Sequence, residues 1–401
     1  MKSWILRKSS LIVLSTLICS LYLLAFYFNG SIYDMLVLRR FAFTDYGVTN
    51  TTKKILYWNT FFGDETFYLG NRFHDCPVND CYATHDRSYA DLLEFDAILF
   101  HANELDLKDL PTRRSPRQWY VFVNLESPGN RPLISQFYED YFNLTMTYRL
   151  DSDVVWTYGT VSDADTGRVV APLLNTTWTI VRNRTGAVQE NHTDASLRKT
   201  IQGKTKPIIW FVSNCNARSG RDQYMHELSR HVTVDVYGSC GKHVCPQSTD
   251  CFTGIAEPDY FFYLSFENTL CEDYVTEKLY NALSYNIVPI VYGGANYSLF
   301  APPRSYINVL DFDTPKKLAE YLTWLMNNPR EYARYFEWKR YYRINKSSRH
   351  AACGLCEFLR REMEPRWHNA LSGWYSSGKC PMHSFLRNKM FVTGAILKNQ
   401  D

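Results

Sequence analysis

Short apolar runs that end in turn-forming residues recur through this chain, and they constrain its fold more than any other feature. In the second half such runs cover Pro207–Val212, Val232–Tyr237, Tyr260–Phe266 and Ile287–Tyr292, and Arg221–Arg230 has a helical pattern. Buried parallel strands have this length and this continuous apolar character. Their alternation with helices predicts an α/β domain built on a parallel sheet.

A similar series precedes it. Lys54–Trp58, Ala97–Phe100 and Trp119–Asn124 read as strands, and the polar stretch Arg182–Lys206 is a plausible linker. We therefore expect two Rossmann-like domains facing across a cleft, with ligands at the carboxyl ends of the strands. The absence of GxGxxG and Walker sequences argues against a dinucleotide enzyme and a P-loop ATPase.

Length and composition agree with two globular domains. The chain has 401 residues, of which 45% are hydrophobic and 21% charged. Its net charge of +3 is close to neutral and implies no polyanionic partner.

The N-terminus predicts a membrane anchor. Ser10–Phe28 carries no charge and is about the length that spans a bilayer, and Lys2, Arg7 and Lys8 precede it, which favours a cytoplasmic N-terminus. A cleaved signal peptide is the alternative, but the run ends in Ala25–Phe28, a poor cleavage site.

Ten cysteines follow this run: Cys76, Cys81, Cys215, Cys240, Cys245, Cys251, Cys271, Cys353, Cys356 and Cys380. An even number fits disulfides in an oxidising compartment, with a connectivity that spacing does not define. Zinc is the alternative for Cys353 and Cys356, but no second pair at matching spacing accompanies them. Glycosylation sequons agree with a lumenal chain and lie at Asn50, Asn143, Asn175, Asn183, Asn191, Asn296 and Asn345, while Asn29 abuts the membrane run.

The stretch Phe266–Leu279 has the parts of a phosphate site. A polar turn follows the predicted strand, and a helix is expected to begin near Val275 with Asp273 as its N-cap. Free N–H groups at a helix N-terminus favour phosphate, and the Lys278 ammonium can join them. On spacing alone, a surface helix with a solvated Glu277–Lys278 pair explains the same residues equally well.

Five ordered motifs resemble the α1,3-fucosyltransferase family, glycosyltransferase family 10, in an invertebrate-type form. They are Asn124-Leu-Glu-Ser-Pro128, Tyr148-Arg-Leu-Asp-Ser-Asp153 with Tyr158-Gly159, Trp210-Phe-Val-Ser-Asn-Cys215 with Ala217-Arg218, Phe266-Glu-Asn-Thr with Asp273-Tyr-Val-Thr-Glu-Lys-Leu279, and Val288-Pro289 to Ser305. The resemblance covers Lys54 to the Cys353–Cys356 pair, essentially the whole predicted lumenal part.

The resemblance implies a GT-B fold of two Rossmann-like domains that transfers fucose with inversion and without an obligatory metal. It implies GDP-fucose as donor and the 3-hydroxyl of a GlcNAc residue in a glycoprotein glycan as acceptor, either in the N-glycan core or on an outer lactosamine-type arm. Glu126 becomes the general base that takes the acceptor proton.

Five further residues match donor-binding positions of the family. Arg221, chosen over the nearby Arg218, and Lys278 would hold the diphosphate, and Asn268, Tyr274 and Glu277 would contact the rest of the donor. A guanidinium binds two phosphate oxygens in a planar fork, whereas lysine acts as a point charge.

The resulting division of the chain is a cytoplasmic tail (1–9), a transmembrane signal anchor (10–28), a stem (29–53), an acceptor-side domain (54–195), a GDP-fucose-binding domain (196–375) and a C-terminal extension (376–401). Such a chain is a single-pass type II protein of the Golgi membrane with a lumenal catalytic part. Nucleic acid is not an expected partner.

Two alternatives remain at this level. A metal-dependent GT-A transferase would use one of the DxD triplets, Asp151–Asp153, Asp163–Asp165 or Asp311–Asp313, to hold a cation. A non-catalytic glycan-binding relative would be expected to lack the motif residues. The cysteines at the expected donor site further suggest a Cys215–Cys271 disulfide.

Overall fold

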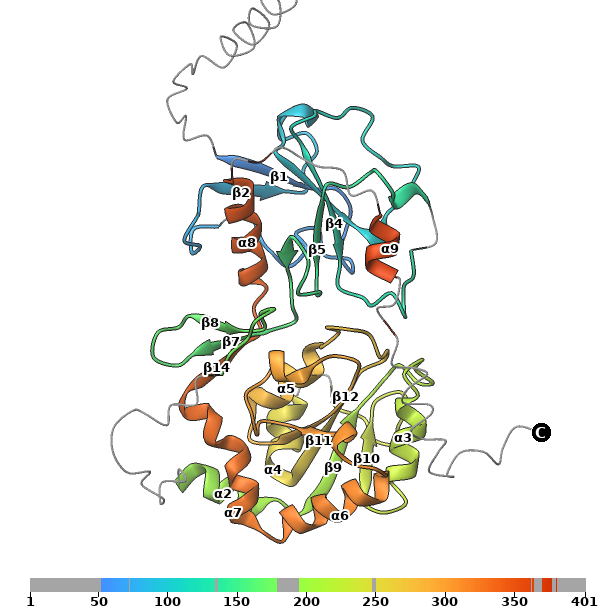
Figure 1. Ribbon diagram of the computed structural model, residues 1–401, viewed down its shortest axis with the longest axis vertical. Coiled ribbons are helices and arrows are strands. Elements are labelled where there is room, and N and C mark those ends of the chain that lie inside the picture. Colours follow the sequence, from blue (N-terminus) through green and yellow to red (C-terminus); the bar gives the residue numbers. More distant parts are fainter. Residues whose placement is uncertain are drawn as a thin grey trace, which may run out of the picture. The chain divides into compact units, whose positions relative to one another are not determined.

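The computed structural model describes residues 52–71, 73–133, 136–178, 195–246, 250–361, 363, 370–376 and 380. Within them the chain forms two parallel sheets and one small antiparallel sheet (Figure 1). The predicted tail, anchor and almost all of the stem lie outside the described residues. Among the residues that are described, no helix combines the length and the apolar character needed to cross a bilayer.

The first sheet has six parallel strands in the order β2-β1-β3-β4-β5-β6. Their bounds are β1 Lys53–Tyr57, β2 Cys81–Thr84, β3 Ala97–His101, β4 Trp119–Asn124, β5 Leu144–Thr147 and β6 Val154–Val155. The central strands β3, β4 and β5 are buried along their whole length. β3 and β4 are largely continuous apolar runs, as strands buried on both faces are, so these two were recognisable in the sequence. β5 alternates leucine and methionine with threonine and was not predicted.

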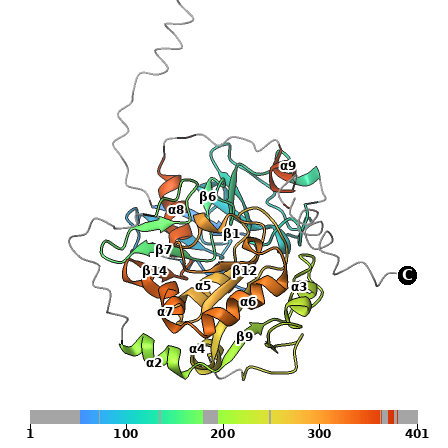
Figure 2. The same ribbon diagram turned by 60° about the horizontal axis from the view of Figure 1, so that its bottom comes forward.

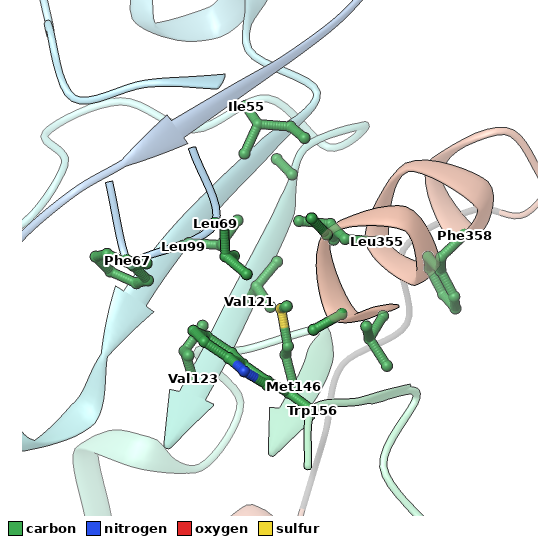
Figure 3. Packing of buried hydrophobic residues seen from close by; sticks show 14 of the residues in the cluster. Ile55, Phe67, Leu69, Leu99, Val121, Val123, Met146, Trp156, Leu355 and Phe358 are labelled. Carbon is green, nitrogen blue, oxygen red and sulfur yellow. The ribbon is translucent and has the colours of Figure 1, made fainter. Parts of the chain in front are cut away.

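Two helices from the far end of the chain cover the first sheet. α8 (Arg349–Leu359) packs on the face formed by Ile55, Leu99 and Val121, as Figure 3 shows for Leu355, and its Phe358 ring lies 5.1 Å from that of Trp119 at the start of β4. The short helix α9 (Leu371–Ser376) packs on the opposite face through buried Leu371 and Tyr375. Alternate residues of each strand point to opposite faces, so each helix meets its own set of strand side chains.

The sequence-based division assigned residues 196–375 to the second domain, whereas α8 and α9 pack on the first sheet. Within the described part of residues 53–155, the connections contain only one-turn 3-10 helices, namely η1 Leu92–Glu94, η2 Ala102–Glu104 and η3 Gln136–Tyr138. The apolar faces of the strands must still be covered. The helices that cover them come from about two hundred residues later, which local patterns do not reveal.

The second sheet has five parallel strands in the order β10-β9-β11-β12-β13. Its strands and helices are β9 Lys206–Phe211, α3 Arg221–Leu228, β10 Val234–Tyr237, the π-helical turn η4 Phe252–Ala256, α4 Glu257–Asp259, β11 Tyr260–Phe266, α5 Glu277–Ser284, β12 Val288–Tyr292, β13 Ile307–Asn308, α6 Pro315–Met326 and α7 Pro329–Ala333. α3 and α6 pack on one face, while η4 and α5 pack on the other, so this half is doubly wound as predicted. Figure 2 labels α3, α5 and α6 around the strands of this sheet.

The third sheet joins distant parts of the chain. It pairs β7 (Thr160–Asp163) with β8 (Val169–Ala171) and with β14 (Tyr342–Asn345), all antiparallel. β14 directly precedes α8, so the chain returns to the first sheet beside the place where it left.

The predicted linker is partly wrong. α2 (Ala195–Gly203) is a helix and buries Ile201, so the second half of the predicted linker is largely helical. The earlier part, 179–194, lies outside the described residues. The apolar spacing of α2 is diluted by polar residues, which made the helix look like a linker.

Five disulfides pair the ten cysteines as Cys76–Cys353, Cys81–Cys356, Cys215–Cys240, Cys245–Cys251 and Cys271–Cys380. The preference for disulfides over zinc at Cys353 and Cys356 is confirmed. The suggested Cys215–Cys271 bond is wrong. Cys215 meets Cys240 just after β10, the strand that neighbours β9, and Cys271 meets Cys380 from the C-terminal segment.

Four sequons lie in the described residues. Asn175, Asn296 and Asn345 are exposed, whereas Asn143 is buried and its Oδ1 accepts a hydrogen bond from the Tyr120 N–H at 3.1 Å. Asn143 is therefore part of the first core.

Candidate active site

Arg221 lies at the point where the strand order of the second sheet reverses. It is 2% exposed at the start of α3, and its two terminal nitrogens donate to the Phe266 carbonyl at 2.7 Å and the Asn214 carbonyl at 2.8 Å. Phe266 is the last residue of β11 and Asn214 follows β9, the two strands between which the order changes direction. Ligands of doubly wound sheets bind at this position.

A buried carboxylate organises the loop after β11. Glu267 is 1% exposed, and its Oε1 accepts a hydrogen bond from the Thr276 N–H at 2.8 Å. Its Oε2 lies 3.4 Å from the Lys278 ammonium, which also lies 3.0 Å from the Glu277 carboxylate. Burial raises the pKa of the Glu267 carboxyl.

Lys278 stays a cation in this surrounding. Burial disfavours its charge, but the carboxylates of Glu267 and Glu277 outweigh that effect and raise the pKa of Lys278. The ammonium therefore sits between two carboxylates next to the first turn of α5.

The N-cap of the helix after β11 lies three residues later than predicted, at Thr276 instead of Asp273. α5 begins at Glu277 with Thr276 as its N-cap, and the Asp273 carboxylate accepts the Leu150 N–H at 3.1 Å instead. Asp273 has a φ of 57°, which is the left-handed backbone conformation and lies outside the range of an α-helix. The Thr276 N–H at the start of α5 donates to the Glu267 carboxylate, so this N–H is not free to bind a phosphate.

Glu126 lies directly after β4 in the first sheet. The Asn124 side chain accepts the Glu126 N–H at 2.9 Å and thereby shapes the turn. The Glu126 carboxylate accepts from the Asn130 amide at 2.9 Å and from the Tyr274 hydroxyl at 3.4 Å. Both hydrogen bonds go to the same carboxylate oxygen, Oε2, so neither donor contacts Oε1.

Three further contacts join the Glu126 turn and the segment after β5 to loops of the second sheet. The hydroxyls of Ser127 and Thr269 lie 2.5 Å apart in a buried hydrogen bond, and Arg218 donates to the Gly129 carbonyl at 2.6 Å. The third is the contact of Asp273 with the segment after β5. Glu126 and the loop after β11 thus form one connected site.

Two buried polar atoms in this site lack a partner among the described residues, the Nε of Arg221 and the Oδ1 of Asn268. One is a donor and the other an acceptor. Buried polar groups are normally hydrogen-bonded, and a ligand or water is the usual explanation where the protein supplies no partner. Both residues were predicted from sequence to contact the donor.

Two of the DxD triplets serve local structure. Asp153 accepts the Thr145 N–H at 2.8 Å, and Asp163 caps its own turn by accepting the Thr166 N–H at 2.8 Å. In the described part of the chain, three potential metal-ligand side chains come together at Asp80, Cys81 and Cys356, but both cysteines are disulfide-bonded.

Several residues of this site were absent from the sequence-based set. Glu267 stands in the Phe266-Glu-Asn-Thr motif, so its motif position was a usable signal. Asn130 lies four residues after Glu126, and only the fold of the turn brings it to the carboxylate. Thr269 stands in the same motif as Glu267, but its partner Ser127 is 142 residues away, so the sequence did not show that the two side chains meet.

Comparison with known families agrees with this geometry. The family model described as "Glycosyltransferase family 10 (fucosyltransferase) C-term" matches residues 201–374. The family model described as "Fucosyltransferase, N-terminal" matches residues 50–159. The two matches contain the second and the first sheet, respectively.

Curated relatives match over most of the chain. α-(1,3)-Fucosyltransferase C of Drosophila melanogaster is 37% identical over 84% of this chain and 80% of its own length. Glycoprotein 3-α-L-fucosyltransferase A of the same species is 34% identical over 82% of this chain and 60% of its own length. 4-Galactosyl-N-acetylglucosaminide 3-α-L-fucosyltransferase 9 of Bos taurus is 32% identical over 91% of this chain and 96% of its own length.

Among solved structures, a crystal structure of α1,3-fucosyltransferase with GDP aligns over 80% of this chain and 94% of that chain, with a TM-score of 0.49 and 17% identity. The complex with GDP-fucose aligns over 79% and 92%, with a TM-score of 0.47 and 15% identity. The family assignment rests on the two family models and on the curated relatives, which are 32–37% identical over most of this chain. The chain belongs to glycosyltransferase family 10 and is an enzyme of the fucosyltransferase family.

Proposed function

We propose that this enzyme transfers fucose with inversion from GDP-β-L-fucose to the 3-hydroxyl of a GlcNAc residue in a glycoprotein glycan. The names of the relatives support the α1,3 linkage, since each of the three acts at a 3-position. The acceptor oxygen forms the new bond to the fucose C1, and the bond from C1 to the β-phosphate oxygen breaks. The acceptor proton passes to Glu126, and GDP leaves.

The observation that carries the proposal is the hydrogen bond from Tyr274 to Glu126. Tyr274 belongs to the motif that resembles the GDP-fucose site, and Glu126 is the carboxylate proposed as general base. A general base must lie within reach of the proton that it takes, so base and donor have to be neighbours. The direct contact of these two motif residues supports that arrangement.

On the donor side, Arg221 and Lys278 would compensate the charge that develops on departing GDP. Arg221 is held by two backbone carbonyls and offers its Nε, while Asn268 offers its Oδ1. Glu277 at the first position of α5 would accept a hydrogen bond from a fucose hydroxyl. These roles are tested by GDP-induced thermal stabilisation, which Arg221→Lys and Lys278→Met should reduce while UDP has no effect on any variant.

The acceptor needs a direct test. Labelled fucose from GDP-fucose is offered to a panel of core-chitobiose and outer-arm lactosamine glycans. Transfer to GlcNAc through an α1,3 linkage supports the proposal, and the glycan with the higher kcat/KM identifies the acceptor. Labelling of a galactose or of another position of GlcNAc contradicts it.

We further propose that no metal is required and that the enzyme is a type II protein of the Golgi membrane. Arg221 and Lys278 supply the positive charge that a cation provides in metal-dependent transferases. EDTA treatment should leave most of the turnover. Complete loss, with recovery on adding Mn²⁺, would overturn the first statement, and microscopy of the full-length chain tests the second.

A further inference from the structure

The C-terminal segment reaches the turn that carries Glu126. Tyr375 in α9 is fully buried, its ring lies 5.5 Å from that of Phe122 on β4, and its hydroxyl donates to the backbone carbonyl of Glu126. Burial raises the pKa of Tyr375 well above its ordinary value, so the hydroxyl remains a donor at every physiological pH.

The neighbouring residue anchors α9 to the first sheet. The Arg149 guanidinium donates to the Trp374 carbonyl at 2.6 Å and lies 4.1 Å from the centre of the indole ring. Asp151 accepts hydrogen bonds from Arg149 at 2.8 Å and from the indole N–H at 3.2 Å. Arg149 and Asp151 belong to one of the family motifs. The Arg149 guanidinium and the Asp151 carboxylate both bind Trp374 and so hold α9 in place.

A disulfide ties the same segment to the other side of the site. Cys380 is bonded to Cys271, which lies in the loop between Glu267 and Thr276. We call this loop the donor loop. Gly129 packs directly on this disulfide: a β-carbon there would lie 3.1 Å from the Cys271 sulfur and 3.3 Å from the Cys380 sulfur. The segment thus touches the Glu126 turn at two places and the donor loop at one.

We infer that α9 and Cys380 form a positioning element, in which Tyr375 holds the Glu126 turn in place and the disulfide holds that turn against the donor loop. This inference rests on the proposed role of Glu126 as general base. A carboxylate that must meet an acceptor hydroxyl loses rate when its turn shifts, because catalytic geometry is tight. Tyr375 acts through Glu126 and need not touch substrate.

Tyr375→Phe is the direct test, with Tyr332→Phe as a matched control. Tyr332 is also fully buried, and its hydroxyl donates to the Phe261 carbonyl at 2.5 Å, near the opposite end of β11 from the site. Each variant removes one hydroxyl that binds a backbone carbonyl. Tyr375→Phe should lower kcat by about tenfold, the rate equivalent of one hydrogen bond, with an unchanged KM for GDP-fucose. Tyr332→Phe should lose a similar amount of thermal stability and keep its kcat.

The division of the effect between kcat and KM separates positioning from general loss of structure. If the turn shifts, the Glu126 carboxylate is displaced from its contacts with Asn130 and Tyr274, so kcat falls in Tyr375→Phe while the KM for GDP-fucose stays the same. A wild-type kcat in Tyr375→Phe would overturn the inference. Equal loss of kcat in Tyr375→Phe and Tyr332→Phe would overturn it as well.

Cys380→Ser provides a second route that leaves every proposed catalytic and donor-binding residue intact. It should lower kcat while GDP still raises the melting temperature, and an unchanged kcat contradicts the role of the disulfide. Glu126→Gln distinguishes the two levels of the argument. An inactive Glu126→Gln beside a fully active Tyr375→Phe removes only the positioning element, whereas an active Glu126→Gln removes the base itself.

Discussion

The hydroxyl of Tyr274 donates a hydrogen bond to the carboxylate of Glu126 over a distance of 3.4 Å, although 148 residues separate the two in sequence. Tyr274 follows the last strand residue of β11 by eight positions, and Glu126 follows that of β4 by two. Each side chain therefore sits at the carboxyl end of a central strand of its own sheet. The contact couples the proposed base to the proposed donor loop.

Tyr274→Phe should lower kcat for fucose transfer by about tenfold, because one of the two hydrogen bonds that orient the Glu126 carboxylate is lost. Tyr148→Phe is the control. The Tyr148 ring lies 5.0 Å from that of Tyr274, but its buried hydroxyl has no partner among the described residues. Steady-state kinetics should show wild-type turnover for Tyr148→Phe. Similar losses in both variants would mean that ring packing, and not the hydrogen bond, matters.

Gly294→Ala should disrupt the donor loop. A β-carbon at Gly294 would lie 2.5 Å from the Leu270 carbonyl carbon and 2.8 Å from the Cys271 nitrogen, and these backbone atoms cannot move aside without displacing the loop. We expect GDP to raise the melting temperature of this variant much less than that of the wild type. Gly354→Ala in α8 is the control, because its β-carbon makes only an ordinary contact of 3.6 Å with Val154. An undiminished GDP effect in Gly294→Ala contradicts the prediction.

The Cys76–Cys353 and Cys81–Cys356 disulfides should stabilise the fold in a non-additive way. They span 277 and 275 residues, and either one alone closes the long interval. Removing one by paired Cys→Ser substitution should cost about 2 kcal/mol, since the other still closes that interval, and removing the second afterwards about 5 kcal/mol. Urea unfolding of the two double variants and the quadruple variant measures the difference. Equal, additive costs would show that the loop-closure argument fails.

Lys204 should make stability rise with pH. Its ammonium is buried and donates to the Tyr260 carbonyl at 2.8 Å, and burial lowers the pKa of Lys204 to about 7. Between pH 7 and the ordinary value near 10.5, the unfolded chain binds one proton more than the folded chain. The free energy of unfolding therefore increases with pH in this window, by at most about 1.4 kcal/mol per unit. Lys204→Met lacks this contribution, so the stability of the wild type relative to Lys204→Met should increase from pH 7 to 9. A difference that is constant over this range refutes the prediction.

Local sequence patterns predicted the long apolar strands well, but they missed short strands such as β2, β5 and β6 and the chain's long-range organisation. Tyr260–Phe266 and Trp119–Asn124 have the predicted bounds, because continuous apolar runs between turn residues have few other solutions in an α/β fold. α8 has an apolar face, but nothing in its residues says which of the two sheets it covers. That choice depends on contacts across more than two hundred residues.

The site shows the same division. Motif resemblance located Glu126, Arg221 and Lys278, and the structure brings all three to the carboxyl ends of strands. It could not reveal that Glu267 would occupy the Thr276 N–H, or that Tyr375 would reach the Glu126 carbonyl. Such contacts depend on the conformation of irregular loops, where one left-handed residue such as Asp273 redirects the chain.

The return of α8 to the first sheet has a consequence for biosynthesis. Cys76 and Cys81 emerge early, but Cys353 and Cys356 follow about 275 residues later. At a synthesis rate of about 5–20 residues per second, the early thiols wait for roughly 15–55 seconds while the second half and its own cysteines appear. Closer but wrong partners, such as Cys215 and Cys240, are available in the meantime. Maturation of this enzyme should therefore depend on thiol–disulfide exchange more than the folding of its two sheets alone would suggest, and co-expression with a disulfide isomerase should raise the yield of active protein.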